Sequence, residues 1–318
     1  MKTTDIKYIE RALQLARNGA GFVSPNPMVG AVIVAPEGKI IGEGWHALYG
    51  GPHAEVNAVN SVRQEDEHLL PQSTIYVTLE PCSHYGKTPP CSKLLIEKRF
   101  KRAVIGMKDP FKEVQGRGIN MLREAGIEVE VGVLENECRE LNRRFITAHE
   151  KKRPYIQLKW AQSADGFIAA LDSSNSDCAN GVPTPLSSPE KLVEMHRERA
   201  LADAILVGTN TLLIDNPSLT ARLWPCRRDP RPVIFKSDRL HPGLKVMERD
   251  PIILDPALHL IENMQLLYKD HGITSLMVEG GAKILRSFLD ANLYDEMRIE
   301  TAGLTLGSGI AAPRLVNG

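Results

Sequence analysis

One histidine, one glutamate and two cysteines have the types and spacing of a catalytic metal site. His53 and Glu55 are separated by a single residue, and Cys82 and Cys91 follow later in the chain. An imidazole and two thiolates suit Zn²⁺, and three protein ligands leave one tetrahedral position open for water. Zinc lowers the pKa of such a water to about 7, and a nearby carboxylate can carry its protons. We therefore predict a zinc site with Glu55 as the proton carrier.

The two cysteines depart from a familiar spacing. A H-x-E motif followed by P-C-x-x-C is typical of zinc deaminases, in which a glutamate that does not bind the metal shuttles protons. In this chain eight residues separate Cys82 from Cys91. A lone cysteine is usually a small core residue, and Cys138, Cys178 and Cys226, which lack such neighbours, are interpreted as structural or incidental.

The predicted elements explain how distant residues meet at this site. Residues 52–56 are expected to begin a helix that holds His53 and Glu55 in its first turn, and residues 74–79 are expected to form a strand. Pro81 ends that strand, so Cys82 is placed where the strand leads into the next helix. The strand end and the helix start then face each other.

The rest of the first half alternates between strands and helices, which predicts a three-layer α/β domain over residues 1–150. A helix over residues 6–16 should begin at Thr4 or Asp5 as its N-cap. The other expected elements are strands 29–34, 40–43 (antiparallel to the preceding one), 102–107 and 127–131, and helices 118–125 and 135–149.

Composition and charge exclude several classes of protein. The 318 residues include 39 Lys and Arg and 39 Asp and Glu, so the net charge is zero and a nucleic-acid partner is not expected. Apolar runs such as Val29–Ala35 are too short to span a membrane, and the N-terminal residues have no apolar signal core. We expect a cytoplasmic enzyme with two domains.

The second half begins after a charged, proline-terminated stretch at residues 150–154, which predicts a second domain over residues 151–318. Ser188 is expected to cap a helix over residues 189–201. Gly280 and Gly281 stand between a predicted strand and a predicted helix, where backbone N–H groups can approach a phosphate. The other expected strands are 155–161, 204–208, 231–235, 251–254 and 275–278.

The motifs of the first half resemble those of the riboflavin-biosynthesis pyrimidine deaminases. The resemblance rests on Asn26-Pro27, His53-Ala54-Glu55 and the segment from Thr78 to Cys91, including its eight-residue spacing. It implies a cytidine-deaminase-like fold, zinc bound by His53, Cys82 and Cys91, and proton transfer by Glu55. It also implies a phosphorylated pyrimidine substrate, for which the candidate binding residues are Asn26, His84, Lys87 and Thr88.

The motifs of the second half resemble the reductase domain that is fused to these deaminases. The resemblance rests on Lys159, Asp165-Gly166, Asp215-Asn216-Pro217 and Glu279-Gly280-Gly281. It implies a dihydrofolate-reductase-like α/β fold that uses NADPH, with Lys159 near the transferred hydride. The implied NADPH-binding residues are Ala161, Thr211, Asp215, Ser237 and Gly281, and the implied substrate-binding residues are Arg199, Leu219, Arg222 and Glu279.

Two features depart from that family. A Ser-x-Trp-Ile-Thr segment is replaced by Pro183-Thr184-Pro185-Leu186-Ser187, and the chain stops at Gly318 where relatives continue with further strands. We therefore expect an exposed sheet edge and a homo-oligomer. The alternatives to a bifunctional enzyme are a deaminase with a degenerate reductase domain used for assembly, a zinc-stabilised binding module, and a nucleic-acid deaminase.

Overall fold

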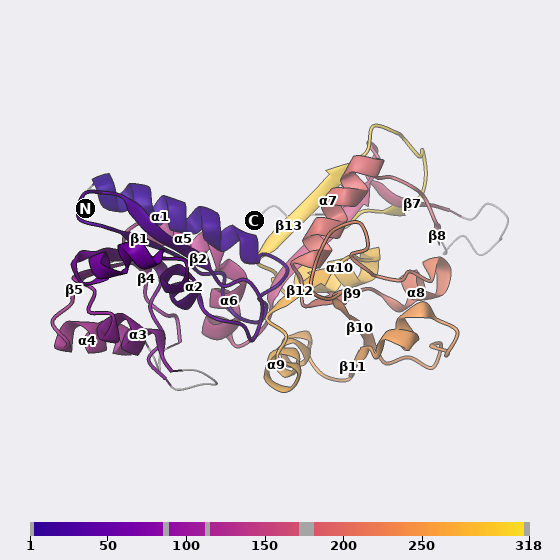
Figure 1. Cartoon of the computed structure of the whole chain (residues 1–318). Helices are drawn as coiled ribbons and strands as arrows, with labels where there is room; N and C mark the ends of the chain where they lie inside the picture. Colours follow the sequence, from indigo (N-terminus) through magenta and orange to yellow (C-terminus); the bar gives the residue numbers. More distant parts are fainter. Residues whose placement is uncertain (1–2, 85–88, 112–114, 172–180, 315–318) are drawn as a thin grey trace. The chain divides into compact units, whose positions relative to one another are not determined.

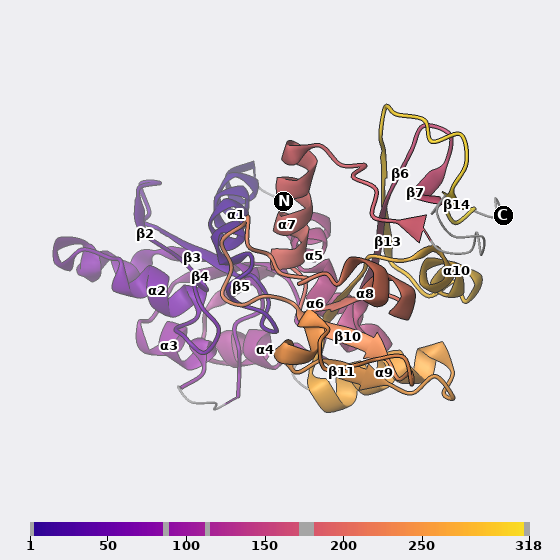
Figure 2. The ribbon, with the colours of Figure 1, turned by 90° about the vertical axis from the view of Figure 1, so that its right-hand side faces the viewer.

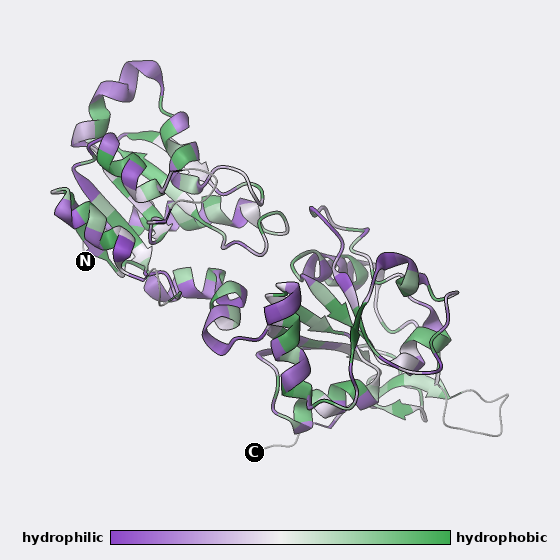
Figure 3. Ribbon diagram, turned by 90° about the horizontal axis from the view of Figure 1, so that it is seen from below, coloured by the Kyte–Doolittle hydropathy of each residue, from purple (hydrophilic) through white to green (hydrophobic). Residues whose placement is uncertain are grey.

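The computed structural model describes residues 3–84, 89–111, 115–171 and 181–314. The chain divides into two compact units, Met1–Glu150 and Lys151–Gly318, and each has its own sheet (Figure 1). In both units the central strands are rich in hydrophobic residues, whereas the outer sides of the helices are mostly hydrophilic (Figure 3). None of the described helices is long and apolar enough to cross a membrane.

The first unit is built on a five-stranded sheet with the order β2-β1-β3-β4-β5. β1 pairs in antiparallel fashion with β2 and β3, and the β3-β4-β5 part is parallel. The expected antiparallel pairing of residues 29–34 with 40–43 is therefore confirmed. The strands are β1 (Gly30–Val34), β2 (Ile40–Trp45), β3 (Thr74–Leu79), β4 (Arg102–Met107) and β5 (Glu128–Val131).

Helices cover both faces of this sheet, as the predicted three-layer fold requires. One face packs on α2 (Ala54–Asn60), α3 (Cys91–Glu97) and α4 (Arg117–Glu124), and the other on α1 (Thr3–Ala16), α5 (Glu135–Leu141) and α6 (Arg143–Lys151). Short 3₁₀ helices follow α1 at Arg17–Gly19 and precede β3 at Gln64–Gln72. The side chains of β1, β3 and β4 alternate between the two layers because successive strand residues point to opposite faces.

Two predictions in this unit are wrong. Asp5 is no N-cap, because α1 begins at Thr3; its buried carboxylate accepts hydrogen bonds from Arg102 (2.7 and 3.1 Å) and Tyr76 (3.1 Å). The single helix expected over residues 135–149 is two helices that meet at Asn142. Its side chain accepts from the Met28 amide (2.8 Å) and donates to the Met28 carbonyl (2.9 Å), and its backbone leaves the helical region.

The second unit contains a six-stranded, all-parallel sheet with the order β11-β10-β9-β12-β6-β13. α9 (Leu260–His271) and α10 (Ala282–Asp290) pack on one face, and α8 (Thr209–Asp215) packs on the other, so the strands are covered from both sides (Figure 2). These strands are β6 (Tyr155–Gln162), β9 (Ala204–Leu206), β10 (Arg231–Phe235), β11 (Ile252–Leu254), β12 (Ser275–Val278) and β13 (Glu296–Thr301).

The unit also contains a smaller, antiparallel sheet with the strand order β14-β7-β8. Ser188 caps α7 (Pro189–Ala200) as predicted, because its hydroxyl accepts from the Lys191 amide (3.3 Å). The sequence did not predict β7, β8, α9, β13 or β14, which are short, exposed or without a clear period. The other elements are β7 (Phe167–Leu171), β8 (Gly181–Val182), α8 (Thr209–Asp215), a 3₁₀ helix (Lys245–Arg249), α9 (Leu260–His271), α10 (Ala282–Asp290) and β14 (Ile310–Ala311).

Candidate active sites

The three predicted zinc ligands lie together in the first unit. One donor atom from each of His53, Cys82 and Cys91 lies within 4.8 Å of the others. The His53 Nδ1 atom is 3.6 Å from the Cys82 Sγ and 3.4 Å from the Cys91 Sγ. Donors bound tetrahedrally to zinc at ordinary bond lengths are about 3.6 Å apart. The donor set and its spacing therefore fit a zinc ion.

The ends of three secondary-structure elements bring these ligands together. His53 is the N-cap of α2 and thus stands just before the first turn in which it was expected. Cys82 follows β3, and Cys91 is the first residue of α3. The Cys91 amide donates to the Cys82 sulfur at 3.2 Å. Hydrogen bonds from Cys91 and His53 lower the pKa of the Cys82 thiol, which favours the thiolate that a metal needs.

Glu55 lies beside the ligands in the first turn of α2 and is only 3% exposed. Burial raises the pKa of its carboxyl to about 7, and the negative charge of Cys82 acts in the same direction. Its carboxyl is within hydrogen-bonding reach of the Cys91 thiol. A carboxyl in this position can both accept and donate a proton near neutral pH.

Glu80 is a second buried carboxylate near the cysteines, but its oxygens are occupied. They accept hydrogen bonds from the backbone amides of Asp109, Gly116, Gly118 and Ile119 at 2.9–3.4 Å. A Cβ atom at Gly118 would approach the carbonyl oxygen of Pro81 to 2.0 Å, so only glycine allows α4 this close. Glu80 thus fixes the turn that presents Cys82.

Asn26 and His46 form a hydrogen-bonded pair near this site. The His46 Nδ1 is 3.0 Å from the Pro52 carbonyl, which can only accept, so this nitrogen carries the proton. The His46 Nε2 then accepts from the Asn26 amide nitrogen at 3.2 Å, and burial lowers the pKa of the ring, which keeps it neutral. The Asn26 carbonyl oxygen is thereby oriented away from His46.

Of the three residues predicted to hold the substrate phosphate, the structure describes His84. His84 is exposed and lies near enough to Asp109 for their charges to interact. Lys87 and Thr88 lie outside the described residues, as does Cys178. Cys138 is fully buried, in agreement with a structural role.

A cavity of about 710 Å³ lies at the carboxyl ends of β6, β9 and β12 in the second unit. This is where ligands bind in open α/β sheets. Six predicted residues line it: Lys159, Ala161, Thr211, Asp215, Glu279 and Gly281. The lining residues that the sequence did not single out include Trp160, Ile214, Lys283 and Ile310.

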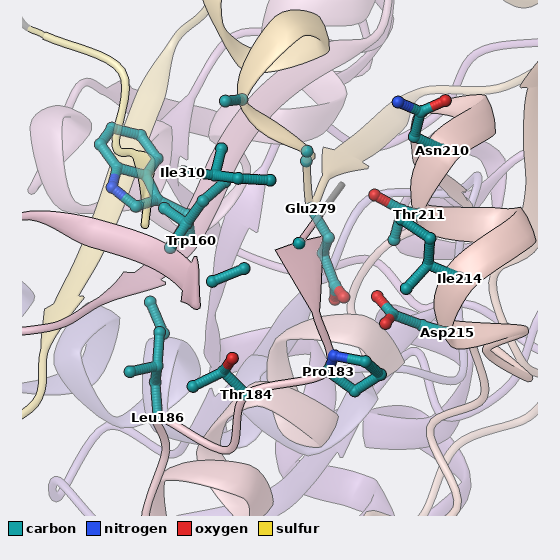
Figure 4. A pocket seen from close by; sticks show the side chains of 18 of the residues that line it. Trp160, Pro183, Thr184, Leu186, Asn210, Thr211, Ile214, Asp215, Glu279 and Ile310 are labelled. Atoms are coloured by element: carbon teal, nitrogen blue, oxygen red, sulfur yellow. The ribbon is translucent and has the colours of Figure 1, made fainter. Parts of the chain in front are cut away.

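Two carboxylates point into this cavity. Figure 4 shows Asp215 and Glu279 turned toward the same space, with Thr211 on the same helix as Asp215. Burial raises the pKa of the Asp215 carboxyl. The Arg199 guanidinium, 7% exposed, holds Glu279 with two hydrogen bonds (2.7 and 2.5 Å) and also donates to the Thr220 carbonyl. Arg199 thus spends three of its five N–H donors within the protein.

The glycine pair shapes one wall of the cavity. Gly280 has φ +107°, a conformation that favours glycine, and its carbonyl accepts from the Gly208 amide at 2.7 Å. Gly281 is the N-cap of α10, and a Cβ atom there would approach the Thr211 hydroxyl to 3.3 Å. This close backbone approach, the lysines at the wall and the cavity volume fit a dinucleotide cofactor.

The other four predicted residues, Arg199, Leu219, Arg222 and Ser237, do not line the cavity. Leu219 is buried in the core, and Arg222 is exposed with a hydrogen bond to the Thr220 hydroxyl (3.3 Å). Ser237 follows β10, where its hydroxyl accepts from the Arg239 amide. The segment from Pro183 to Ser187, which replaces the family's tryptophan-containing loop, does form part of the wall (Figure 4).

Comparisons with known proteins decide between the remaining interpretations. The family model of the RibD C-terminal domain matches residues 154–318, and that of the cytidine and deoxycytidylate deaminase zinc-binding region matches residues 2–107. The riboflavin biosynthesis protein RibD of Aquifex aeolicus is 38% identical over 334 residues, which cover 98% of this chain and 90% of the relative. The chain belongs to the RibD family.

Other RibD proteins agree in sequence and in structure. The Escherichia coli RibD is 35% identical over 340 residues, covering 96% of this chain and 89% of its own. The Acinetobacter baumannii RibD structure superposes with a TM-score of 0.86 at 33% identity, and the Thermotoga maritima deaminase/reductase structure with 0.84 at 37%. Each alignment covers 97% of this chain and 89% of that structure.

Family membership confirms the predicted α/β fold and the bifunctional deaminase and reductase of riboflavin biosynthesis. The RibD match extends over the second unit, which favours this interpretation over a deaminase with a degenerate reductase domain. The predicted zinc agrees with the zinc-binding match and with the donor cluster, and the predicted NADPH agrees with the RibD reductase domain and its cavity.

Proposed function

We propose that the first unit, residues 1–150, deaminates 2,5-diamino-6-ribosylamino-4(3H)-pyrimidinone 5′-phosphate. The second unit, residues 151–318, reduces the ribosyl group of the product to ribityl with NADPH. The observation that carries the proposal is the cluster of His53, Cys82 and Cys91 beside the buried Glu55. The T. maritima relative is named for both a pyrimidine deaminase and a uracil reductase activity, which supports this pair of reactions.

In the first unit, His53, Cys82 and Cys91 hold the zinc ion through one donor atom each. When bound, zinc acts as a Lewis acid that makes water a nucleophile at neutral pH. Glu55 accepts one proton of the attacking water at its carboxylate and delivers it to a ring nitrogen of the pyrimidine; it then carries the second proton of that water to the amine, which leaves as ammonia. Its burial beside the ligands keeps bulk water from competing for that proton.

The substrate is held on two sides of this site. The carbonyl oxygen of Asn26, oriented by His46, accepts from the polar edge of the pyrimidine. His84, Lys87 and Thr88 provide cationic and hydroxyl donors for the 5′-phosphate. These residues belong to the eight that separate Cys82 from Cys91 in the sequence.

In the second unit, NADPH would supply the hydride when bound, and Ala161, Thr211, Asp215 and Gly281, which line the cavity, would hold it. Lys159 lies at the cavity wall and donates a proton or hydrogen bond to the ribose oxygen as the ring opens.

The candidate substrate-binding residues of this unit are Glu279, which lines the cavity, Arg199, which holds Glu279, and the exposed Arg222, whereas Leu219 is buried in the core. Arg199 orients Glu279 through their bidentate contact, and the exposed Arg222 is the more available cation for the phosphate.

We also propose a cytoplasmic homo-oligomer. The outer edge of β13 has no strand partner among the described residues, and an unpaired edge strand is usually covered by another chain or segment. Light scattering of the purified chain tests this proposal, and a monomer at micromolar concentration would contradict it.

The proposed pair of reactions is tested with the diaminopyrimidine substrate and NADPH. Ammonia should be released without NADPH, and NADPH absorbance should fall only once the deaminated product has formed. Ammonia release with stable NADPH absorbance, even after added product, would leave a deaminase alone. Salt-sensitive binding of single-stranded oligonucleotides would instead favour a nucleic-acid deaminase.

A further inference from the structure

Glu300 stands behind the wall of the second cavity and contacts two residues that line it. It lies on β13 opposite Ala161 of the parallel strand β6. The Ser187 hydroxyl donates to its Oε2 atom at 2.7 Å, and the Lys159 Nζ is 3.9 Å from the same oxygen. Lys159 and Ser187 both line the cavity. One carboxylate therefore connects the proposed catalytic lysine with the 183–187 wall segment.

This ion pair is sheltered from solvent. The Lys159 side chain is 14% exposed and the Glu300 side chain 17% exposed, so water and salt screen their attraction less than at the surface. At 3.9 Å the contact is an ion pair rather than a hydrogen bond. The three N–H donors of Lys159 thus stay available to a ligand in the cavity while the carboxylate fixes the position of the ammonium group.

Two other cations near Glu300 in the described part of the chain have carboxylate partners of their own. Arg298, which lies opposite Lys159 in the sheet, pairs with Glu296 (2.7 Å) and Glu198 (3.2 Å). Lys191 of α7 pairs with Glu194 at 2.7 Å. The charge of Glu300 is therefore directed mainly at Lys159.

We infer that Glu300 is a positioning residue of the reductase: its carboxylate holds the Lys159 ammonium at the cavity and anchors the 183–187 segment through Ser187. This inference rests on the proposed role of Lys159 in the reduction. Glu300 does not itself line the cavity, so it acts through these two residues.

Two substitutions separate the two contacts. Glu300→Gln removes the charge but keeps an oxygen that accepts from Ser187, and Ser187→Ala removes the hydrogen bond but keeps the charge. We expect Glu300→Gln to lower the reductase kcat about tenfold, since misplaced reacting groups lose rate. The KM for NADPH should stay within about twofold, and Glu300→Asp should recover part of the rate because it restores the charge. Ser187→Ala should instead raise the KM for NADPH and leave the reductase kcat nearly unchanged.

The outcomes distinguish this inference from the proposed function. A normal kcat in Glu300→Gln overturns the inference, as does a rise in KM equal to that of Ser187→Ala, which would make Glu300 a wall anchor only. Lys159→Met is measured in parallel, and full reductase activity in that variant would refute the role of Lys159 itself. NADPH binding by titration checks that the second unit of each variant is folded. If Glu300→Gln no longer binds NADPH, the kcat and KM of Glu300→Asp are compared with those of Ser187→Ala instead.

Discussion

The two units place their reactive groups differently. In the first, the ligands and the proton carrier come from two short stretches, residues 53–55 and 82–91, and their atoms already touch. In the second, the cavity wall is assembled from β6, the 183–187 segment, α8 and the β12–α10 turn. A site made of contacting donor atoms depends on a few side chains, whereas a cavity depends on how several elements are held.

The largest effect is expected from Glu55→Gln. Without a carboxylate to move the proton, deamination should fall on the order of 10³-fold. Zinc content should be unchanged because Glu55 is not among the ligands. Ammonia release and metal analysis of the same sample provide the measurement. Reductase activity on the deaminated product is the internal control, and near-normal deamination would contradict the proton-carrier role.

Lys159→Met should affect the reductase activity of the second unit. Loss of the ammonium at the cavity should lower the reductase kcat on the order of 10²-fold, while ammonia release stays normal. Lys283→Met is a matched control at the same cavity, because Lys283 also lines the wall but lies on α10. If the reductase kcat fell equally in both variants, the loss would reflect the positive charge at the cavity wall rather than a specific role of Lys159.

Asp5→Asn should destabilise the first unit alone. Arg102, buried at 9% exposure, would lose the charge of its main partner, a change that typically costs about 3 kcal/mol. The unfolding transition of the first unit should move to lower temperature while that of the second unit stays in place. Glu128→Gln, which removes an exposed partner of the same arginine, should cost much less.

The smallest effect is expected from Ser188→Ala, which removes the N-cap of α7 at a cost of about 1 kcal/mol. The unfolding transition of the second unit should shift slightly, and deamination should not change. A shift in the first transition would show that the two units do not unfold separately. Together with Asp5→Asn, this variant tests whether the units are energetically independent.

The sequence predicted the first site better than the second for physical reasons. His53, Glu55, Cys82 and Cys91 are chemically distinctive, and the strand–helix junctions that carry them follow from apolar runs and proline. No such signal marks Trp160. It follows Lys159 in a strand, where neighbouring side chains are expected to face opposite sides of the sheet, yet both residues line the cavity.

Glu300 was missed for a similar reason. It reaches the cavity wall only through the pairing of β13 with β6, and no local pattern encodes that pairing. The break of the helix at Asn142 was not visible either, because its cause lies 114 residues away at Met28.

That contact between Asn142 and Met28 has a consequence for dividing the chain. Every ligand of the metal site precedes residue 92, and the zinc-binding match ends at residue 107. Asn142 nevertheless holds both backbone groups of Met28, two residues after Asn26, as a neighbouring strand would. A shortened deaminase that ends near residue 107 would therefore keep its metal donors but lose the support behind Asn26. A fragment that keeps this support has to extend at least to Asn142, well beyond the last metal ligand.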